Sequence, residues 1–226
     1  MIIPSNKSYQ IAQRIYHVDN FRFPDKYPKL SFLTFNSLCH KQLKLSGYNP
    51  FDFEIRSIEI CKSTIDEVKK YLKSCQYSIV LSMMQEEGRG RDGKTWASPI
   101  GGIWLSIGFN TQAKVVELSS VVVKSIKKSL KKYLVCEIKP PNDIIIGGKK
   151  LCGLLVETTS IADQFEQVII GVGINVFNDI PEELLGIATR MKDHCDPPSI
   201  PELSSAITVG LLDNLNFLLN PEHQIE

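Results

Sequence analysis

Residues 139–157 read KPPNDIIIGGKKLCGLLVE, and this stretch decides the fold class. Two apolar runs flank Gly147 and Gly148, and a two-residue glycine turn between such runs predicts a tight β-hairpin. The hairpin places Asp143 at the start of its first strand and Lys150 just past its tip. Strands joined by hairpins form a mixed, largely antiparallel sheet. The stretch therefore predicts an α+β fold and not a doubly wound parallel sheet.

The segments around this hairpin indicate further strands and helices. Apolar runs or alternation predict strands at residues 56–60, 78–83, 103–109 and 167–176. Helical spacing predicts helices at residues 64–74, 114–134, 181–185 and 200–219. Ser63 or Thr64 is suited to cap the first of these helices. Gly171 and Gly173 inside the last strand indicate that something approaches its backbone closely.

The loop GRGRDGKT, residues 88–95, satisfies two nucleotide-binding patterns, the P-loop GxxxxGK[ST] and the dinucleotide fingerprint GxGxxG. Both patterns require a helix directly after the loop, because the N–H groups of that helix hold the phosphates. Here residues 99–102 contain a proline and two glycines, which prevent such a helix. The sequence instead indicates a glycine loop leading to a strand. In this loop, Arg89 and Arg91 offer planar donors to a carboxylate or a phosphate.

Length and composition limit the classes of protein to consider. A chain of 226 residues has room for one substantial domain and a small appendage, and its net charge of +1 does not call for nucleic acid. The six cysteines form no CxxC pair and no metal-ligand spacing with the four histidines, which indicates reduced thiols. No apolar run approaches a membrane span, and the N-terminus lacks the apolar core of a signal peptide. We expect a cytoplasmic location, with an organellar one as the alternative.

Residues 1–54 form a separate zone rich in phenylalanine, tyrosine and proline. The zone shows no pair of amphipathic helices joined by a glycine turn, so a winged helix-turn-helix is not expected there. We predict an N-terminal extension of unknown role that packs on the main body, followed by one domain at residues 55–226.

Four blocks of this sequence stand in an order and at a spacing that resemble one family. They are QEEGRGRDGKTW, KPPND, KKLCGLLVE and GVGINV. Together they resemble the catalytic domain of biotin protein ligases, from about residue 56 to the C-terminus. The resemblance implies a class II synthetase-like fold and a ligase that uses ATP and Mg²⁺. Such an enzyme forms biotinyl-5'-AMP and transfers biotin to a lysine of a biotin carboxyl carrier protein. The resemblance leaves a homodimer open, while the net charge, the N-terminal zone and the lack of long apolar runs predict no nucleic-acid partner and no membrane partner.

The resemblance also assigns roles to residues by their place in these blocks. The catalytic cations would be Lys150, Arg89 and Arg91. The biotin site would comprise Ser63, Thr64, Gln85, Gly88, Arg89, Gly90, Arg91, Lys150 and Gly153. The ATP site would comprise Arg91, Trp96, Lys139, Asn142, Asp143, Lys150 and Asn175, and the metal ligands would be Asp143 and Asn175. Elementary chemistry agrees with the cations, since attack of a carboxylate on a phosphate brings two anions together and the barrier falls mainly by charge neutralisation.

The sequence departs from the family pattern at three positions. Ile65 replaces an asparagine after the Ser-Thr pair, Asp92 replaces a common third arginine, and Pro140 replaces an aromatic residue. The family's small C-terminal domain is also expected to be absent. Two alternatives therefore stay open, namely a ligase for another acid such as lipoate and a non-catalytic structural subunit of a larger assembly. A P-loop NTPase is disfavoured because no helix follows the glycine loop.

Overall fold

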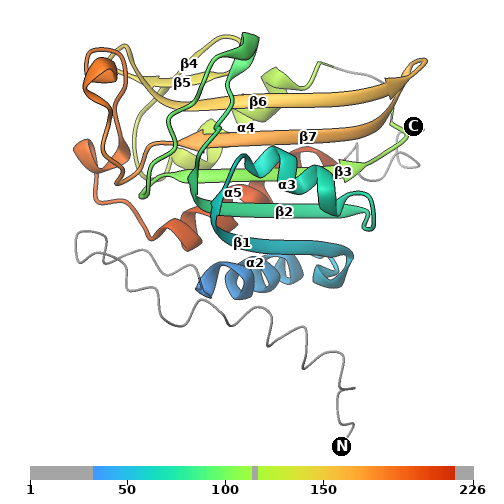
Figure 1. The fold of residues 1–226 in the computed structure, drawn as a ribbon. Coiled ribbons are helices and arrows are strands. Elements are labelled where there is room, and N and C mark those ends of the chain that lie inside the picture. The colour runs from blue at the N-terminus through green and yellow to red at the C-terminus, as the bar shows by residue number, and fades with distance from the viewer. Residues whose placement is uncertain (1–32, 114–116, 217–226) are drawn as a thin grey trace, which may run out of the picture.

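The computed structural model describes residues 33–113 and 117–216. Within these residues, seven strands form one sheet in the order β1-β2-β3-β7-β6-β5-β4 (Figure 1). Their bounds are β1 Phe53–Cys61, β2 Tyr77–Gln85, β3 Ile103–Asn110, β4 Glu137–Lys139, β5 Asp143–Ile146, β6 Lys149–Ile161 and β7 Gln164–Ile174. Strands β1 and β2 are parallel, and the other neighbouring pairs are antiparallel. The predicted α+β fold with a mixed, largely antiparallel sheet is confirmed.

Helices cover both faces of this sheet. One face carries α2 Leu33–Leu45, α4 Ser119–Leu130 and α5 Ile200–Asn214, and the other carries α3 Thr64–Tyr71 (Figure 1). Helix α5 packs against α2, α4 and β3, whereas α3 packs against β2, β3 and β7. Single 3-10 turns lie at Pro50–Asp52, Arg91–Gly93, Glu182–Leu184 and Met191–Asp193. None of the helices in the described residues is long and apolar enough to cross a membrane.

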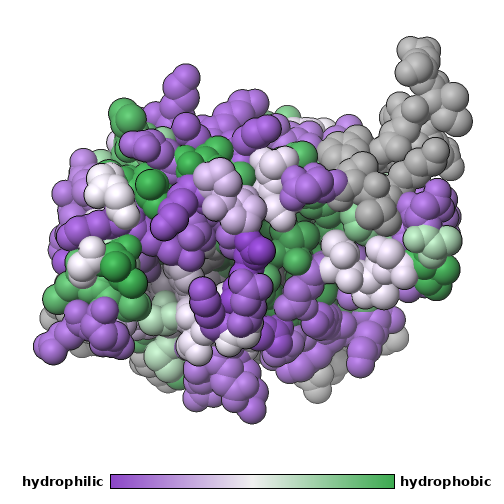
Figure 2. Space-filling model, turned by 90° about the horizontal axis from the view of Figure 1, so that it is seen from above, coloured by the Kyte–Doolittle hydropathy of each residue, from purple (hydrophilic) through white to green (hydrophobic). Residues whose placement is uncertain are grey.

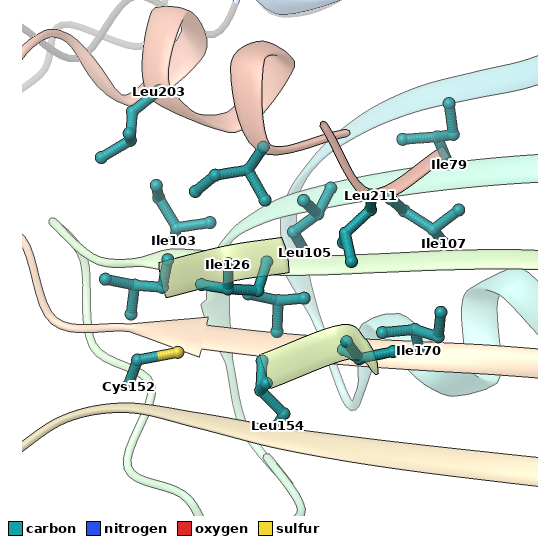
Figure 3. Close-up of a cluster of buried hydrophobic side chains, with 14 of the residues drawn as sticks. Ile79, Ile103, Leu105, Ile107, Ile126, Cys152, Leu154, Ile170, Leu203 and Leu211 are labelled. Atoms are coloured by element: carbon teal, nitrogen blue, oxygen red, sulfur yellow. The ribbon is translucent and has the colours of Figure 1, made fainter. Parts of the chain in front are cut away.

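The alternation of side chains along the central strands builds a separate core on each face. Ile79 of β2 joins the large cluster under α4 and α5, while its neighbour Val80 joins Val68 of α3 on the opposite face. Figure 3 shows the large cluster, which includes Ile103, Leu105, Ile107, Ile126, Cys152, Leu154, Ile170, Leu203 and Leu211. Each fully buried aliphatic side chain contributes about 1.5–3 kcal/mol. Because β2 and β3 are covered on both faces, their sequences are nearly continuous runs of apolar residues.

The predicted hairpin is confirmed at the expected residues. Gly147 and Gly148 have φ of 55° and 78°, the left-handed region that a tight two-residue turn requires. The hairpin joins β5 to β6, so Asp143 begins one strand and Lys150 lies beside the tip of the other. Strand β4, which the sequence did not predict, pairs with β5 and is the edge strand on this side of the sheet.

The predicted strands are confirmed with small changes of length, whereas the predicted helices are shorter in the structure. The helix predicted at residues 64–74 ends at Tyr71, and the helix predicted at residues 200–219 ends at Asn214, with residues 217–219 outside the description. The helix predicted at residues 114–134 begins at Ser119 in the structure, and residues 114–116 lie outside the description. The Glu117 carboxylate accepts hydrogen bonds from the backbone N–H of Ser119 at 2.8 Å and of Ser120 at 3.0 Å, which caps the helix there. Hydrogen bonding with the Ser120 side chain, together with the bonds from the Ser120 and Ser119 backbone, lowers the pKa of Glu117. The helix predicted at residues 181–185 is a single 3-10 turn.

Part of the N-terminal zone packs on the main body. Phe35, Cys39 and Leu43 of α2 are fully buried against α5 and β1, although the sequence predicted no helix there. Strand β1 begins at Phe53, two residues before the domain start predicted at residue 55. Residues 1–32 lie outside the description, so the division of the chain stays a prediction.

Seen from the β4 edge of the sheet, the surface is largely hydrophilic (Figure 2). Hydrophobic residues appear on this face in small groups between hydrophilic ones. Single exposed hydrophobic residues are normal on globular proteins and need no partner to explain them.

Candidate active site

A cavity of about 260 Å³ lies on the α3 side of the sheet. It is enclosed by the start of α3, by the loop at residues 88–95 and by β6 and β7. Eight of the nine residues predicted to bind biotin line it, namely Ser63, Thr64, Gln85, Arg89, Gly90, Arg91, Lys150 and Gly153. Gly88 does not line it, although a Cβ at this position would lie 2.4 Å from the Trp96 carbonyl oxygen. Gly88 therefore allows close packing at the base of the loop.

A hydrogen-bond network fixes the polar end of the cavity. The Gln85 Oε1 atom accepts from the Thr64 backbone N–H at 2.8 Å and from Thr64 Oγ1 at 3.0 Å. Gln85 Nε2 donates to Ser98 Oγ at 2.8 Å, and Thr64 Oγ1 lies 2.7 Å from Ser106 Oγ. Because both ends of the Gln85 amide have partners, its orientation is set before any ligand binds.

Ser63 supplies a hydroxyl group that is ready to bind a ligand. Ser63 is only 1% exposed, and its Oγ has no hydrogen-bond partner within the described part of the chain. Although Ser63 precedes α3, its side chain makes no capping bond, contrary to the prediction. A buried hydroxyl without a partner costs about 1–3 kcal/mol, so a ligand atom that pairs with it would gain that stabilisation.

The middle of the cavity is apolar. Ile65 and Leu155 line it, and Ile65 is buried between α3 and β7. A Cβ at Gly171 would lie 2.9 Å from Ile65 Cδ1, so the glycine makes room for this side chain. Ile65, one of the departures from the family pattern, thus acts as a wall of the cavity.

Trp96 lies over two glycines at the floor of the cavity. A Cβ at Gly153 or at Gly173 would lie 2.6 Å from atoms of its indole ring. The close approach predicted for the last strand is therefore made by the protein's own side chains, Trp96 at Gly173 and Ile65 at Gly171. The indole Nε1 is buried and has no hydrogen-bond partner in the described residues.

Lys150 is held at the edge of the same cavity. Its Nζ forms an ion pair with Asp143 Oδ1 at 2.8 Å and lies 5.0 Å from the centre of the Trp96 ring. Its backbone N–H donates to the Ile187 carbonyl at 2.7 Å, and its carbonyl accepts from the Thr189 N–H at 2.9 Å. This short parallel bridge fixes the backbone of Lys150 between two segments that are distant in sequence.

The arginine loop folds as a small hairpin. The Gly90 N–H donates to the Lys94 carbonyl at 2.6 Å, and a bridge pairs Arg89 with Thr95. Asp92 lies at the exposed tip with φ of 57°. No α-helix separates the loop from β3, which agrees with our rejection of both nucleotide-binding patterns.

The two arginines of this loop have different partners. Arg91 Nη1 donates to Asn142 Oδ1 at 3.4 Å, a long bond to a neutral group. Arg89 Nη2 instead forms an ion pair with Asp66 Oδ1 of α3 at 2.8 Å. Arg89 thus directs its charge to a carboxylate of the protein.

A second cavity of about 190 Å³ adjoins the first. Both cavities are lined by Thr95, Trp96 and Lys150. Much of the remaining wall of the second cavity is apolar and comes from Ala97, Ile180, Pro181, Leu184, Ile187 and Ala188. No local pattern in the sequence shows that this wall packs beside Trp96.

The residues predicted for ATP and its metal do not all meet. Asn175 lines the second cavity, but its Oδ1 already accepts from Asn178 Nδ2 at 3.1 Å. Asp143 lines the first cavity, and its buried Oδ1 has no hydrogen bond and only the ion pair with Lys150. Lys139 is exposed on β4 and lines neither cavity, so its predicted role stays a prediction.

A single carboxylate fits Mg²⁺ that is bound mainly by a nucleotide. Within the described residues, no group of three or more His, Cys, Asp or Glu side chains could hold a metal ion. Mg²⁺ is commonly held by one or two carboxylates together with substrate phosphates. Asp143 meets this requirement, and the role of Asn175, whose Oδ1 accepts one hydrogen bond from Asn178, stays a prediction.

The fold and the site define a class of protein: a mixed-sheet domain with two adjoining cavities and cationic side chains near the place where they meet. Residues 57–175 match the sequence profile of the Biotin/lipoate A/B protein ligase family. This segment is more than half of the 226 residues, and the chain belongs to that family. The resemblance to the catalytic domain of biotin protein ligases is confirmed.

Individual relatives agree with this assignment. The bifunctional ligase/repressor BirA of Bacillus subtilis (strain 168) is 36% identical over 123 residues, which cover 50% of this chain and 38% of that protein. The biotin–protein ligase of Homo sapiens is 35% identical over 115 residues, which cover 46% of this chain and 16% of that protein. The matched part of the chain thus spans well under half the length of these relatives. Among solved structures, the biotin protein ligase from Aquifex aeolicus in complex with biotin and ATP has a TM-score of 0.64 and 26% identity, covering 74% of this chain and 72% of that chain.

Proposed function

We propose that this chain is an ATP-dependent biotin protein ligase. It forms biotinyl-5'-AMP and then transfers biotin to a lysine of a biotin carboxyl carrier domain. The observation that carries the proposal is that two adjoining cavities share Lys150 and Trp96. Relatives described as biotin protein ligases, one of them solved with biotin and ATP, support it.

Biotin occupies the larger cavity in this proposal. Its urea group has one carbonyl acceptor and two N–H donors, which suit the free Ser63 hydroxyl and the ordered Thr64 and Gln85 side chains. Its apolar ring atoms and aliphatic chain suit the walls formed by Ile65 and Leu155. This orientation brings its carboxylate toward Lys150.

ATP places its adenine against the apolar wall of the second cavity in this proposal. Leu184, Ile187 and the Trp96 ring offer the flat apolar surface that a purine binds. The α-phosphate then lies where the cavities meet, next to Lys150 and within reach of Arg91. Of the other departures, Asp92 lies at the loop tip and lines the larger cavity, whereas Pro140 lines neither cavity.

The first step joins two anions, and the protein's task is to neutralise and align them. A carboxylate oxygen of biotin attacks the α-phosphorus, and the bond to the bridging oxygen breaks with its electron pair leaving on pyrophosphate. Lys150 and Arg91 stabilise the negative charge that gathers on the phosphoryl oxygens. Mg²⁺ held by the phosphates and Asp143 would neutralise further charge.

No nucleophilic side chain takes part in this chemistry. Cys152 lies directly under the hairpin, but burial raises its pKa and keeps it as an unreactive thiol. In the second step, the carrier lysine attacks the acyl carbon of the mixed anhydride and AMP leaves. The identity of that carrier, a homodimer and a cytoplasmic location stay predictions.

The test is to incubate the chain with α-labelled ATP, Mg²⁺ and either biotin or lipoate. We expect pyrophosphate release and a retained acyl-adenylate with biotin alone. A product with lipoate alone, or no product together with no biotin-dependent thermal shift, would contradict the proposal.

A pair of neighbouring lysines tests the role of the cavity cation. Lys150→Ala should slow adenylate formation by about 10²–10³-fold, the usual effect of removing one group that stabilises developing charge. Lys149→Ala is the matched control, because Lys149 Nζ is exposed and donates to the Leu185 carbonyl at 3.2 Å. Equal rates for the two variants would remove Lys150 from the mechanism.

A further inference from the structure

Four charged side chains form a chain of ion pairs beside the larger cavity, and we call them the arginine anchor. Asp66 and Lys69 come from α3, Arg89 from the loop and Glu157 from β6. Arg89 Nη2 lies 2.8 Å from Asp66 Oδ1 and 3.7 Å from Glu157 Oε1. Lys69 Nζ lies 2.7 Å from Glu157 Oε2. The anchor therefore links three elements that surround the cavity.

Local structure directs these carboxylates to the loop. Glu157 is two and four residues after Leu155 and Gly153 on β6, so its side chain shares the cavity face of the strand. Asp66 lies in the first turn of α3, directly after Ile65, another residue that lines the cavity. Arg89 extends from the loop and contacts both the Asp66 and the Glu157 carboxylates.

The charge of Arg89 is already balanced by carboxylates, which distinguishes it from Arg91, the other arginine of the loop. Two carboxylates face Arg89, whereas Arg91 has the neutral amide of Asn142 at 3.4 Å. A guanidinium paired with carboxylates gives less net charge to a neighbouring phosphate than an unpaired one. Arg89 is thus better placed to hold the loop than to neutralise the reacting anions.

We propose that Asp66 and Glu157 are positioning residues that anchor the loop through Arg89, and that this anchor controls how long the acyl-adenylate is retained. The retention part rests on the proposed function. In the unliganded protein, the anchor keeps the loop closed onto α3. During catalysis it slows escape of the mixed anhydride and entry of water.

The first experiment needs no ligand. Trypsin cleavage after Arg91 and Lys94, followed by mass spectrometry, measures how often the loop opens. We expect Asp66→Asn to speed this cleavage by about two- to fivefold, the range for a half-exposed ion pair. The matched control is Glu67→Gln, because Glu67 has the same charge in the same helical turn but pairs with Lys70 at 2.5 Å.

Further variants separate anchoring from general loss of folding. Glu157→Gln removes the carboxylate on β6 and should give the same direction of change as Asp66→Asn. Asp66→Glu keeps the charge and should restore slow cleavage in part. High salt should speed cleavage of the unmodified chain more than that of Asp66→Asn, because screening weakens the pair that only the former contains.

The second experiment measures retention. After one round of adenylation, rapid gel filtration follows the loss of labelled biotinyl-AMP from the protein. We expect Asp66→Asn to speed that loss by about two- to fivefold while changing the rate of the first turnover less. A purely structural defect would speed the loss but would also slow the first turnover to a similar extent and lower the melting temperature.

The outcomes distinguish the anchor from the proposed function. If cleavage responds to Asp66→Asn but no variant forms adenylate, the anchor stands and the proposed function fails. If adenylate forms and neither cleavage nor retention differs between Asp66→Asn and Glu67→Gln, the anchor is refuted. A slower first turnover with unchanged retention would also overturn it, since Arg89 would then act on the chemistry.

Discussion

Adding one methyl group at Gly173 tests whether Trp96 holds the two cavities in their observed arrangement. A Cβ there would lie 2.6 Å from Trp96 Nε1 and 2.7 Å from Cε2. The ring would have to move by about 0.9 Å to regain a separation of about 3.5 Å. It also lies over Gly153 and beside Lys150, so it does not move without displacing the cavity wall.

The expected cost of Gly173→Ala has a structural and a functional part. Overpacking a tight contact destabilises a protein by about 1–3 kcal/mol. Because Lys150 lies 5.0 Å above the same ring, its ammonium group moves with the indole. A displacement near 1 Å at a reacting centre costs about 100-fold in rate, so we expect a fall of about 10- to 100-fold in adenylate formation.

The assay combines urea unfolding, adenylation kinetics and intrinsic fluorescence. The chain has two tryptophans, and Trp104 is fully buried with its Nε1 donating to the Pro99 carbonyl at 3.0 Å. Emission changes on substitution or on ligand binding therefore report Trp96. The control is Gly186→Ala, since a Cβ at Gly186 meets nothing within 4 Å.

One result would refute this reasoning. If Gly173→Ala matches Gly186→Ala in its unfolding midpoint, emission spectrum and adenylation rate, the indole does not lie on β7 in solution.

Three further outcomes follow from the contacts around the site and the core. Thr64→Val should destabilise the fold by about 1–3 kcal/mol and weaken biotin binding, because it removes a hydroxyl bonded to Gln85 and Ser106; urea titration and calorimetry measure both effects. Ala162→Gly should raise stability by about 1 kcal/mol without changing adenylation, because Ala162 has φ of 52° in the turn after β6, and an unchanged or lower melting temperature would contradict this. Burial raises the pKa of Cys39 from 9.0 to about 12, so the stability contributed by its neutral thiol is complete below pH 9 and is lost as the pH rises toward 12. Mass spectrometry after alkylation of the native protein at pH 8.5 should find Cys39 unmodified.

Local patterns predicted most of the elements and failed where an element depends on distant partners. The β5–β6 hairpin was predictable because two adjacent glycines adopt positive φ more readily than other residues. Strand β4 and helix α2 were missed, since β4 has three residues and forms by pairing with β5, and α2 is stabilised by packing on α5. The start of α4 shifted because the Glu117 side chain binds the first N–H groups of the helix.

The sequence by itself determined the fold class, which depends on periodicity and turn chemistry. It also indicated residues that line the larger cavity, through the resemblance of four sequence blocks to the biotin protein ligase family. It did not show that Trp96 covers two glycines or that a second cavity adjoins the first. Nor did it show that Arg89 pairs with carboxylates of α3 and β6. Only the tertiary structure decided these features, because each joins residues from separate elements whose contacts are set by how helices and loops pack on the sheet.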